Sequence, residues 1–81
     1  MTTFSEAEAY RQRAIIALRA AGLTAEADRL AALLPIKDEA TAYAAICPCV
    51  DAGSTAWDAG AQVAWGAALE AAGASAYAEE S

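Results

Sequence analysis

The sequence predicts an all-α protein: a compact three- to four-helix bundle built on an N-terminal αα-hairpin and a long C-terminal helix. Alanine, which has the highest helix propensity, occupies 26 of the 81 positions. Capping residues, glycines and prolines divide the chain into segments of helical length, and no segment alternates polar and apolar residues as a half-buried strand does. We therefore expect one helical domain over residues 1–73 and a frayed acidic tail over residues 74–81.

The first two helices are expected to form the hairpin. Ser5 and Glu8 have the spacing of a capping box, which places the start of the first helix at Ser5. Gly22 suits the left-handed conformation that commonly follows the end of a helix. A second helix is expected over residues 25–34, because Pro35 cannot continue it. The link between the two helices is short, so they should pack antiparallel.

The third and fourth helices differ in length. Asp38 is a favourable N-cap for a third helix over residues 39–47, which Pro48 is expected to end. After a loop, the fourth and longest helix is expected over residues 54–73. It is rich in alanine and glycine, so another helix could approach it closely.

The charges are distributed unevenly along the chain. The basic residues are confined to the first 37 positions: Arg11, Arg13, Arg19, Arg29 and Lys37. From Asp38 onward every charged residue is acidic, the chain has no histidine, and its net charge is −6. Direct binding to nucleic acid requires clustered lysine and arginine, and so does binding to anionic membranes. We therefore expect neither, and a partner with a basic surface is favoured.

Location follows from what the sequence lacks. No cationic N-terminus followed by an apolar stretch marks a signal peptide. Polar residues interrupt the apolar C-terminal half, so no membrane span is expected there. Two cysteines in a chain of this kind fit a reducing cytoplasm, where they stay as thiols.

The sequence contains no recognisable catalytic set. Without histidine, triads and dyads that use it are excluded, and the glycines do not form a phosphate-binding loop. We expect no enzymatic activity and no cofactor. The one local motif with reactive groups is Cys47-Pro48-Cys49, interpreted as two structural thiols at a helix end. The alternative is a metal or redox site. Zinc takes four ligands, so a zinc site would need Asp51 and further residues, or two chains that share their cysteines.

Arg11 breaks the pattern of the first helix. At 100° per residue it falls on the apolar side, between Leu18 and Ile15. Such an arginine either extends outward along its stem or pairs with a carboxylate. The alternative is a charge that binds a ligand carboxylate or phosphate.

The fourth helix is apolar over more than half of its circumference. It is interpreted either as the central helix of the bundle, which would be buried on most sides, or as a helix that docks a partner along one edge. Tryptophan carries much of the contact energy in protein interfaces. The partner-binding residues expected are Trp57, Trp65, Leu69, Asp58 and Glu70.

These observations predict a small protein-interaction module, an inhibitor or modulator that occludes a functional surface of a larger protein. One alternative is an acidic mimic of nucleic acid, because Asp58 and Glu70 belong to a polar stripe that could occupy a basic groove. Another is a homodimer in which the fourth helices pack through Gly60, Ala64 and Ala71.

Overall fold

The computed structural model describes residues 2–80, and the side chains of residues 2–73. All regular structure in this range is helical, and it contains no strand, which confirms the all-α prediction. One of its segments, η1, contains a kink between two helical stretches. The elements are α1 (Phe4–Ala20), α2 (Thr24–Ala31), α3 (Glu39–Asp51), α4 (Ser54–Ala56), η1 (Trp57–Ala61) and α5 (Gln62–Glu80). Over the described residues, no helix combines the length and hydropathy needed to cross a membrane.

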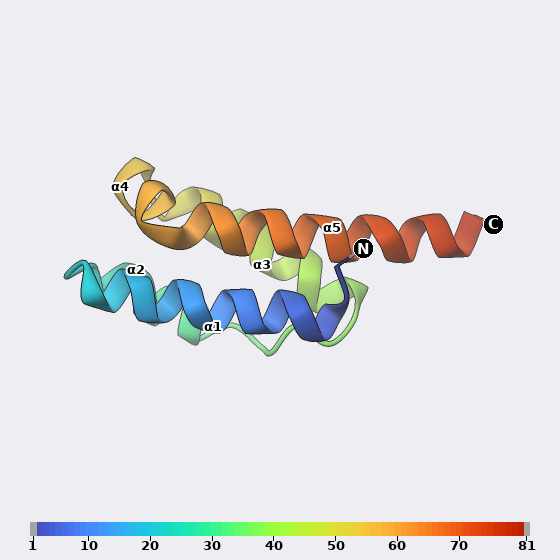
Figure 1. Ribbon diagram of the computed structural model, residues 1–81, viewed down its shortest axis with the longest axis horizontal. Coiled ribbons are helices and arrows are strands. Elements are labelled where there is room, and N and C mark those ends of the chain that lie inside the picture. Colours follow the sequence, from blue (N-terminus) through green and yellow to red (C-terminus); the bar gives the residue numbers. More distant parts are fainter. Residues whose placement is uncertain (1, 81) are drawn as a thin grey trace.

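The helices form a bundle around α5. Figure 1 shows α1 and α5 running antiparallel along the length of the molecule, with α3 behind α5. α2 folds back along α1, which confirms the predicted N-terminal hairpin. α1 and α3 therefore cover two sides of α5, and its third side is open.

The N-cap of α1 is Thr3, two residues before the predicted Ser5. The Thr3 hydroxyl accepts a hydrogen bond from the backbone N–H of Glu6 at 3.1 Å. Thr3 and Glu6 have the same spacing as Ser5 and Glu8. The structure selects the earlier pair because Glu8 is engaged with Arg11 instead.

The turn between α1 and α2 follows the prediction. Gly22 has a φ of 82°, in the left-handed region that favours glycine. The N–H of Gly22 bonds to the carbonyl of Arg19 at 3.1 Å, and that of Leu23 to the carbonyl of Leu18 at 2.8 Å. These two bonds are those of a Schellman motif. α2 ends at Ala31, earlier than predicted.

α3 begins as predicted but continues beyond its predicted end. Asp38 caps it in a full capping box with Thr41, whose N–H bonds to the Asp38 carboxylate at 2.9 Å. The helix then passes through Pro48 and ends at Asp51, so the prediction that Pro48 ends it was wrong. An interior proline costs about 3 kcal/mol. The turn that follows Pro48 buries Cys49 completely against the core.

The fourth predicted helix starts at Ser54 as expected but bends. The backbone leaves helical geometry at Gly60, inside η1. A Cβ atom at Gly60 would lie 3.2 Å from the Cβ of Ala17, so a larger residue at this position would require α1 to shift by a few tenths of an ångström. α5 continues past the predicted end at Gly73 as far as Glu80. The side chains of residues 74–81 lie outside the described part of the chain, so the frayed tail stays a prediction.

The core consists mostly of alanine. Its largest fully buried side chains are Leu18, Leu30 and Cys49, and most other buried positions are alanines of α1, α3 and α5. Small side chains let the helix axes approach closely, but they remove little apolar surface from water. Several large apolar side chains remain outside this core.

Candidate functional site

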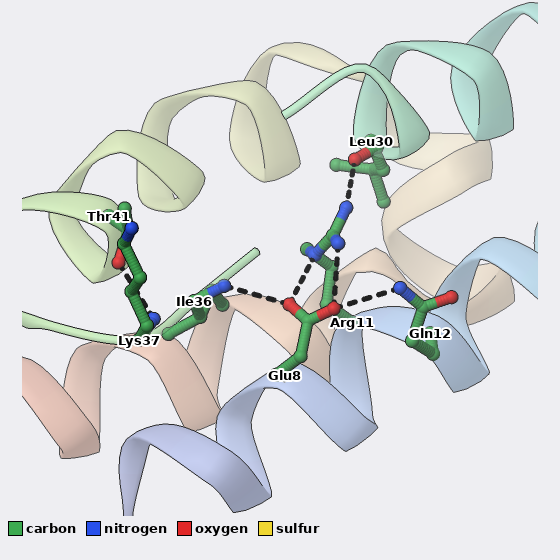
Figure 2. Close-up of polar contacts among 7 residues, drawn as sticks. All are labelled: Glu8, Arg11, Gln12, Leu30, Ile36, Lys37 and Thr41. Carbon is green, nitrogen blue, oxygen red and sulfur yellow. Dashed lines mark hydrogen bonds and ion pairs between the residues drawn. The ribbon is translucent and has the colours of Figure 1, made fainter. Parts of the chain in front are cut away.

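Arg11 is held inside the protein by its own chain. Its guanidinium donates two hydrogen bonds to the Glu8 carboxylate, from Nε at 2.8 Å and from Nη2 at 2.7 Å. Nη1 donates to the backbone carbonyl of Leu30 at 2.5 Å. The side chain is 3% exposed. Figure 2 shows these contacts converging between α1 and the end of α2, so the geometry supports the structural interpretation of Arg11.

Glu8 is the centre of this network. It also accepts hydrogen bonds from Gln12 at 2.8 Å and from the backbone N–H of Ile36 at 2.9 Å (Figure 2). The hydrogen bonds from Arg11 are the main cause that lowers the pKa of Glu8 to about 2. The carboxylate therefore stays ionised and joins α1 to the segment before α3.

The two cysteines lie on opposite sides of α3. Cys47 is exposed and Cys49 is fully buried, as expected for residues two apart on a helix. Burial raises the pKa of the Cys49 thiol to about 11, which keeps it protonated. Two thiols arranged in this way cannot bind one metal ion without unwinding the helix. Among the described residues, no group of three or more metal-ligating side chains is present.

The face suggested for a homodimer is used within the chain. Ala64 and Ala71 are buried, and Gly60 packs against Ala17 of α1. Ala64 and Ala71 are therefore covered within the chain, whereas Gly60 is half-buried, so a dimer packed through all three residues would require these helices to separate.

The two tryptophans form a pair on the surface. Their ring centroids are 5.2 Å apart with an interplanar angle of 58°. Eight residues of a straight helix span about 12 Å, so Trp57 and Trp65 meet because the chain bends at Gly60. Both are half-buried, and Trp65 packs on the core cluster that contains Leu18 and Cys49. The bend therefore assembles an aromatic pair from two turns of chain.

Leu69 extends this pair along α5. It lies one turn after Trp65 and is 42% exposed. Asp58 is exposed beside Trp57 in sequence. Glu70 lies about 140° around the helix from Trp65, and it accepts a hydrogen bond from Thr2. The structure therefore brings together Trp57, Trp65 and Leu69, leaves Asp58 exposed next to Trp57 in the sequence, and places Glu70 on another edge.

A second apolar strip lies on α3, and the sequence analysis missed it. Tyr43 is 50% exposed and Val50 is 51% exposed. Ile46 lies between them on the same side of the helix and packs against the alanine cluster of α5. A signal for this strip was present, because α3 has no charged residue between Ala40 and Val50. It was overlooked because the helix was expected to end before Val50.

The two strips border each other. The edge of α5 that carries Val63 and Glu70 faces α1, since Val63 lines a cavity with Tyr10. The opposite edge, with Trp65 and Leu69, therefore borders α3. We call this combined surface the α3–α5 face, which consists of Tyr43, Ile46, Val50, Trp57, Trp65 and Leu69.

Comparisons with protein-family models, with curated proteins and with solved structures returned no match, so the α3–α5 face has to be interpreted from its own geometry.

Proposed function

We propose that this chain is a non-enzymatic protein-interaction module whose α3–α5 face binds a segment of a larger protein. The observation that carries the proposal is the position of the large apolar side chains. Most buried positions are alanines, whereas the α3–α5 face carries six large apolar or aromatic residues, of which three are exposed and three are half-buried. A contiguous apolar surface of this kind marks an interaction site in a soluble protein.

The form of the face indicates the form of the partner. Two packed helices with apolar strips at their shared border offer an apolar surface to the apolar side of an amphipathic helix. Trp57 and Trp65 are held against each other and against the core. They would lose little side-chain entropy on binding, which favours them as anchors.

The charges near the α3–α5 face indicate which residues should flank the apolar side of the partner helix. Asp51 and Asp58 are both exposed where α3 leads through α4 into η1. No lysine or arginine follows Lys37 in the chain. We therefore expect a partner helix with an apolar face and a basic flank. Binding would cover the partner helix and prevent that helix from contacting other molecules. The protein would therefore modulate its partner by occlusion, and it would do so in the cytoplasm.

The test is affinity capture from a nuclease-treated lysate at low and high salt. We expect one stoichiometric partner that is lost when Leu69→Lys or Trp65→Ala is used as bait. Ile16→Lys is the matched control for Leu69→Lys, because Ile16 is 67% exposed on α1, away from the α3–α5 face. Helicity of each variant is checked by circular dichroism, since Trp65 also packs on the core.

Two outcomes would contradict the proposal. If Ile16→Lys and Leu69→Lys reduce capture equally, the α3–α5 face has no special role. If a basic partner is lost at high salt but is retained by both variants at low salt, electrostatic mimicry of nucleic acid is the better explanation. The bend at Gly60 weighs against that alternative, because it interrupts the four-residue repeat between Asp58 and Gln62.

A further inference from the structure

A cavity lies on the opposite edge of α5 from the α3–α5 face. Its volume is about 180 Å³, and it lies between α1 and the bend that η1 makes into α5. Gly60 and Ala17 are among its lining residues and are in close contact. Val63, which is 53% exposed, and Tyr10 add larger apolar surface. The cavity therefore lies at the kink at Gly60, opposite Ala17 of α1.

One lining residue carries a charge. The guanidinium of Arg13 lies 5.5 Å from the centre of the Tyr10 ring, which orients it by a cation–π contact. Arg11 pairs with Glu8, and Arg19 pairs with Asp28 at 3.3 Å. No carboxylate among the described side chains pairs with Arg13 in this way. Arg13 is thus an exposed cation at the edge of an apolar cavity, with no carboxylate paired to it among the described side chains, and this arrangement is complementary to an anion with an apolar body.

We propose that this cavity binds a small amphiphilic carboxylate, an aryl or short alkyl acid whose carboxylate pairs with Arg13. Size supports this class of ligand. An engineered apolar cavity of about 150 Å³ holds a benzene molecule, so a volume of about 180 Å³ accommodates one ring and a short side chain. The ring or chain would contact Val63 and Gly60. The carboxylate would accept hydrogen bonds from the guanidinium at the cavity edge.

The proposal does not depend on the function of the α3–α5 face, because the two sites lie on different edges of α5. Small ligands that contact only part of a shallow site bind weakly. We therefore expect an affinity in the high-micromolar to millimolar range, where solution NMR detects binding by chemical-shift changes.

The experiment is an NMR titration of the full chain with 3-phenylpropionate. Its neutral analogue 3-phenylpropanamide, which has the same ring and chain length, serves as the matched ligand. We expect shift changes at Gly60, Ala17 and Val63, and binding of the acid about three- to tenfold tighter than binding of the amide. Arg13→Gln should remove this difference. Arg29→Gln makes the same change in charge at an exposed position on α2 and should leave it in place.

The proposal would be overturned by absence of saturable shifts at Gly60 and Val63, or by equal affinity for the acid and the amide. It would also be overturned if Arg29→Gln weakened binding of the acid as much as Arg13→Gln does, since that result would show that the acid responds only to the net charge of the protein. Shifts confined to Trp65 and Leu69 would assign the ligand to the α3–α5 face and reject the cavity.

Discussion

At the scale of single residues, the buried pair of Arg11 and Glu8 has the largest structural consequence. Arg11 connects α1 to the carbonyl of Leu30 at the end of α2. Glu8 connects α1 to the backbone of Ile36 before α3. One ion pair therefore fixes three segments in a core that has few large apolar side chains. The alternative role of Arg11 in ligand binding loses support because its donors are directed to partners within the chain.

This arrangement predicts very different costs for two arginine substitutions. Arg11→Ala leaves the Glu8 carboxylate part-buried without its main partner, so we expect a loss of about 3–5 kcal/mol in the free energy of unfolding. Arg19→Ala removes an ion pair whose side chains are 50% and 62% exposed, and we expect a loss below about 1 kcal/mol. Urea unfolding followed by circular dichroism measures both. Equal losses would show that the pair of Arg11 and Glu8 contributes no more to stability than the exposed pair of Arg19 and Asp28.

Glu8 also predicts how stability depends on pH. Its pKa is lowered from 4.5 to about 2, chiefly by hydrogen bonds from Arg11. A lowered pKa in the folded state adds stability above the unfolded value, and this stability is lost as the pH falls from about 4.5 toward 2. The contribution is at most about 3 kcal/mol.

Comparison with Glu8→Gln tests that dependence. The variant should be less stable than the parent chain at pH 7, and its free energy of unfolding should fall less steeply between pH 4.5 and pH 2. Hydrogen bonds from Thr41 also lower the pKa of Asp38, so some slope should remain in both proteins. Parallel curves for the two proteins would contradict the role given to Glu8.

At the scale of elements, the bend at Gly60 lies next to both candidate sites. Trp57 contacts Trp65 across the bend, and Gly60 itself lines the cavity together with Val63 and Tyr10. Gly60 also lies against α1, where a Cβ atom at position 60 would be 3.2 Å from the Cβ atom of Ala17.

A double-mutant cycle tests that contact. Gly60→Ala would place its Cβ atom 3.2 Å from the Cβ of Ala17, so we expect a loss of about 1–3 kcal/mol from overpacking. Ala17→Gly in the same chain should recover part of that loss, because it removes the opposing atom. Thermal unfolding measures stability, and near-ultraviolet circular dichroism reports the coupling of Trp57 and Trp65. Additive effects of the two substitutions would show that the contact does not hold the bend.

The same elements show what sequence could and could not predict. The Asp38 cap and the Gly22 turn depend on residues close in sequence, and both were predicted correctly. The passage of α3 through Pro48 and the bend at Gly60 depend on packing against distant segments. Local rules do not contain those contacts, so both were missed. The partner of Arg11 at Leu30 is 19 residues away and was missed for the same reason.

The candidate site was likewise predicted only where it depends on residues that are close together in the sequence. Trp57, Trp65 and Leu69 were predicted from the composition of one helix, and the structure brings them to one edge of α5. The strip of Tyr43 and Val50 escaped prediction because it requires α3 to continue past Pro48.

At the scale of the whole molecule, large apolar side chains are divided between a small core and the α3–α5 face. If this face is a surface and not part of the core, it should tolerate charge. We predict that the triple variant Tyr43→Lys, Val50→Lys, Leu69→Lys stays folded, with a change in the free energy of unfolding below about 2 kcal/mol. All three side chains are at least 42% exposed. A cooperative loss of helicity in this variant would show that the face is a structural part of the bundle.

The most direct test of the account is the affinity of this triple variant for the captured partner, measured by isothermal titration calorimetry beside the parent chain. Three lysines would oppose the basic flank of the partner helix and cover the apolar strips of both α3 and α5. The account predicts that affinity falls by about 100-fold or more while the variant remains folded. An unchanged affinity in the folded triple variant would show that the partner binds elsewhere and would contradict the role proposed for the α3–α5 face.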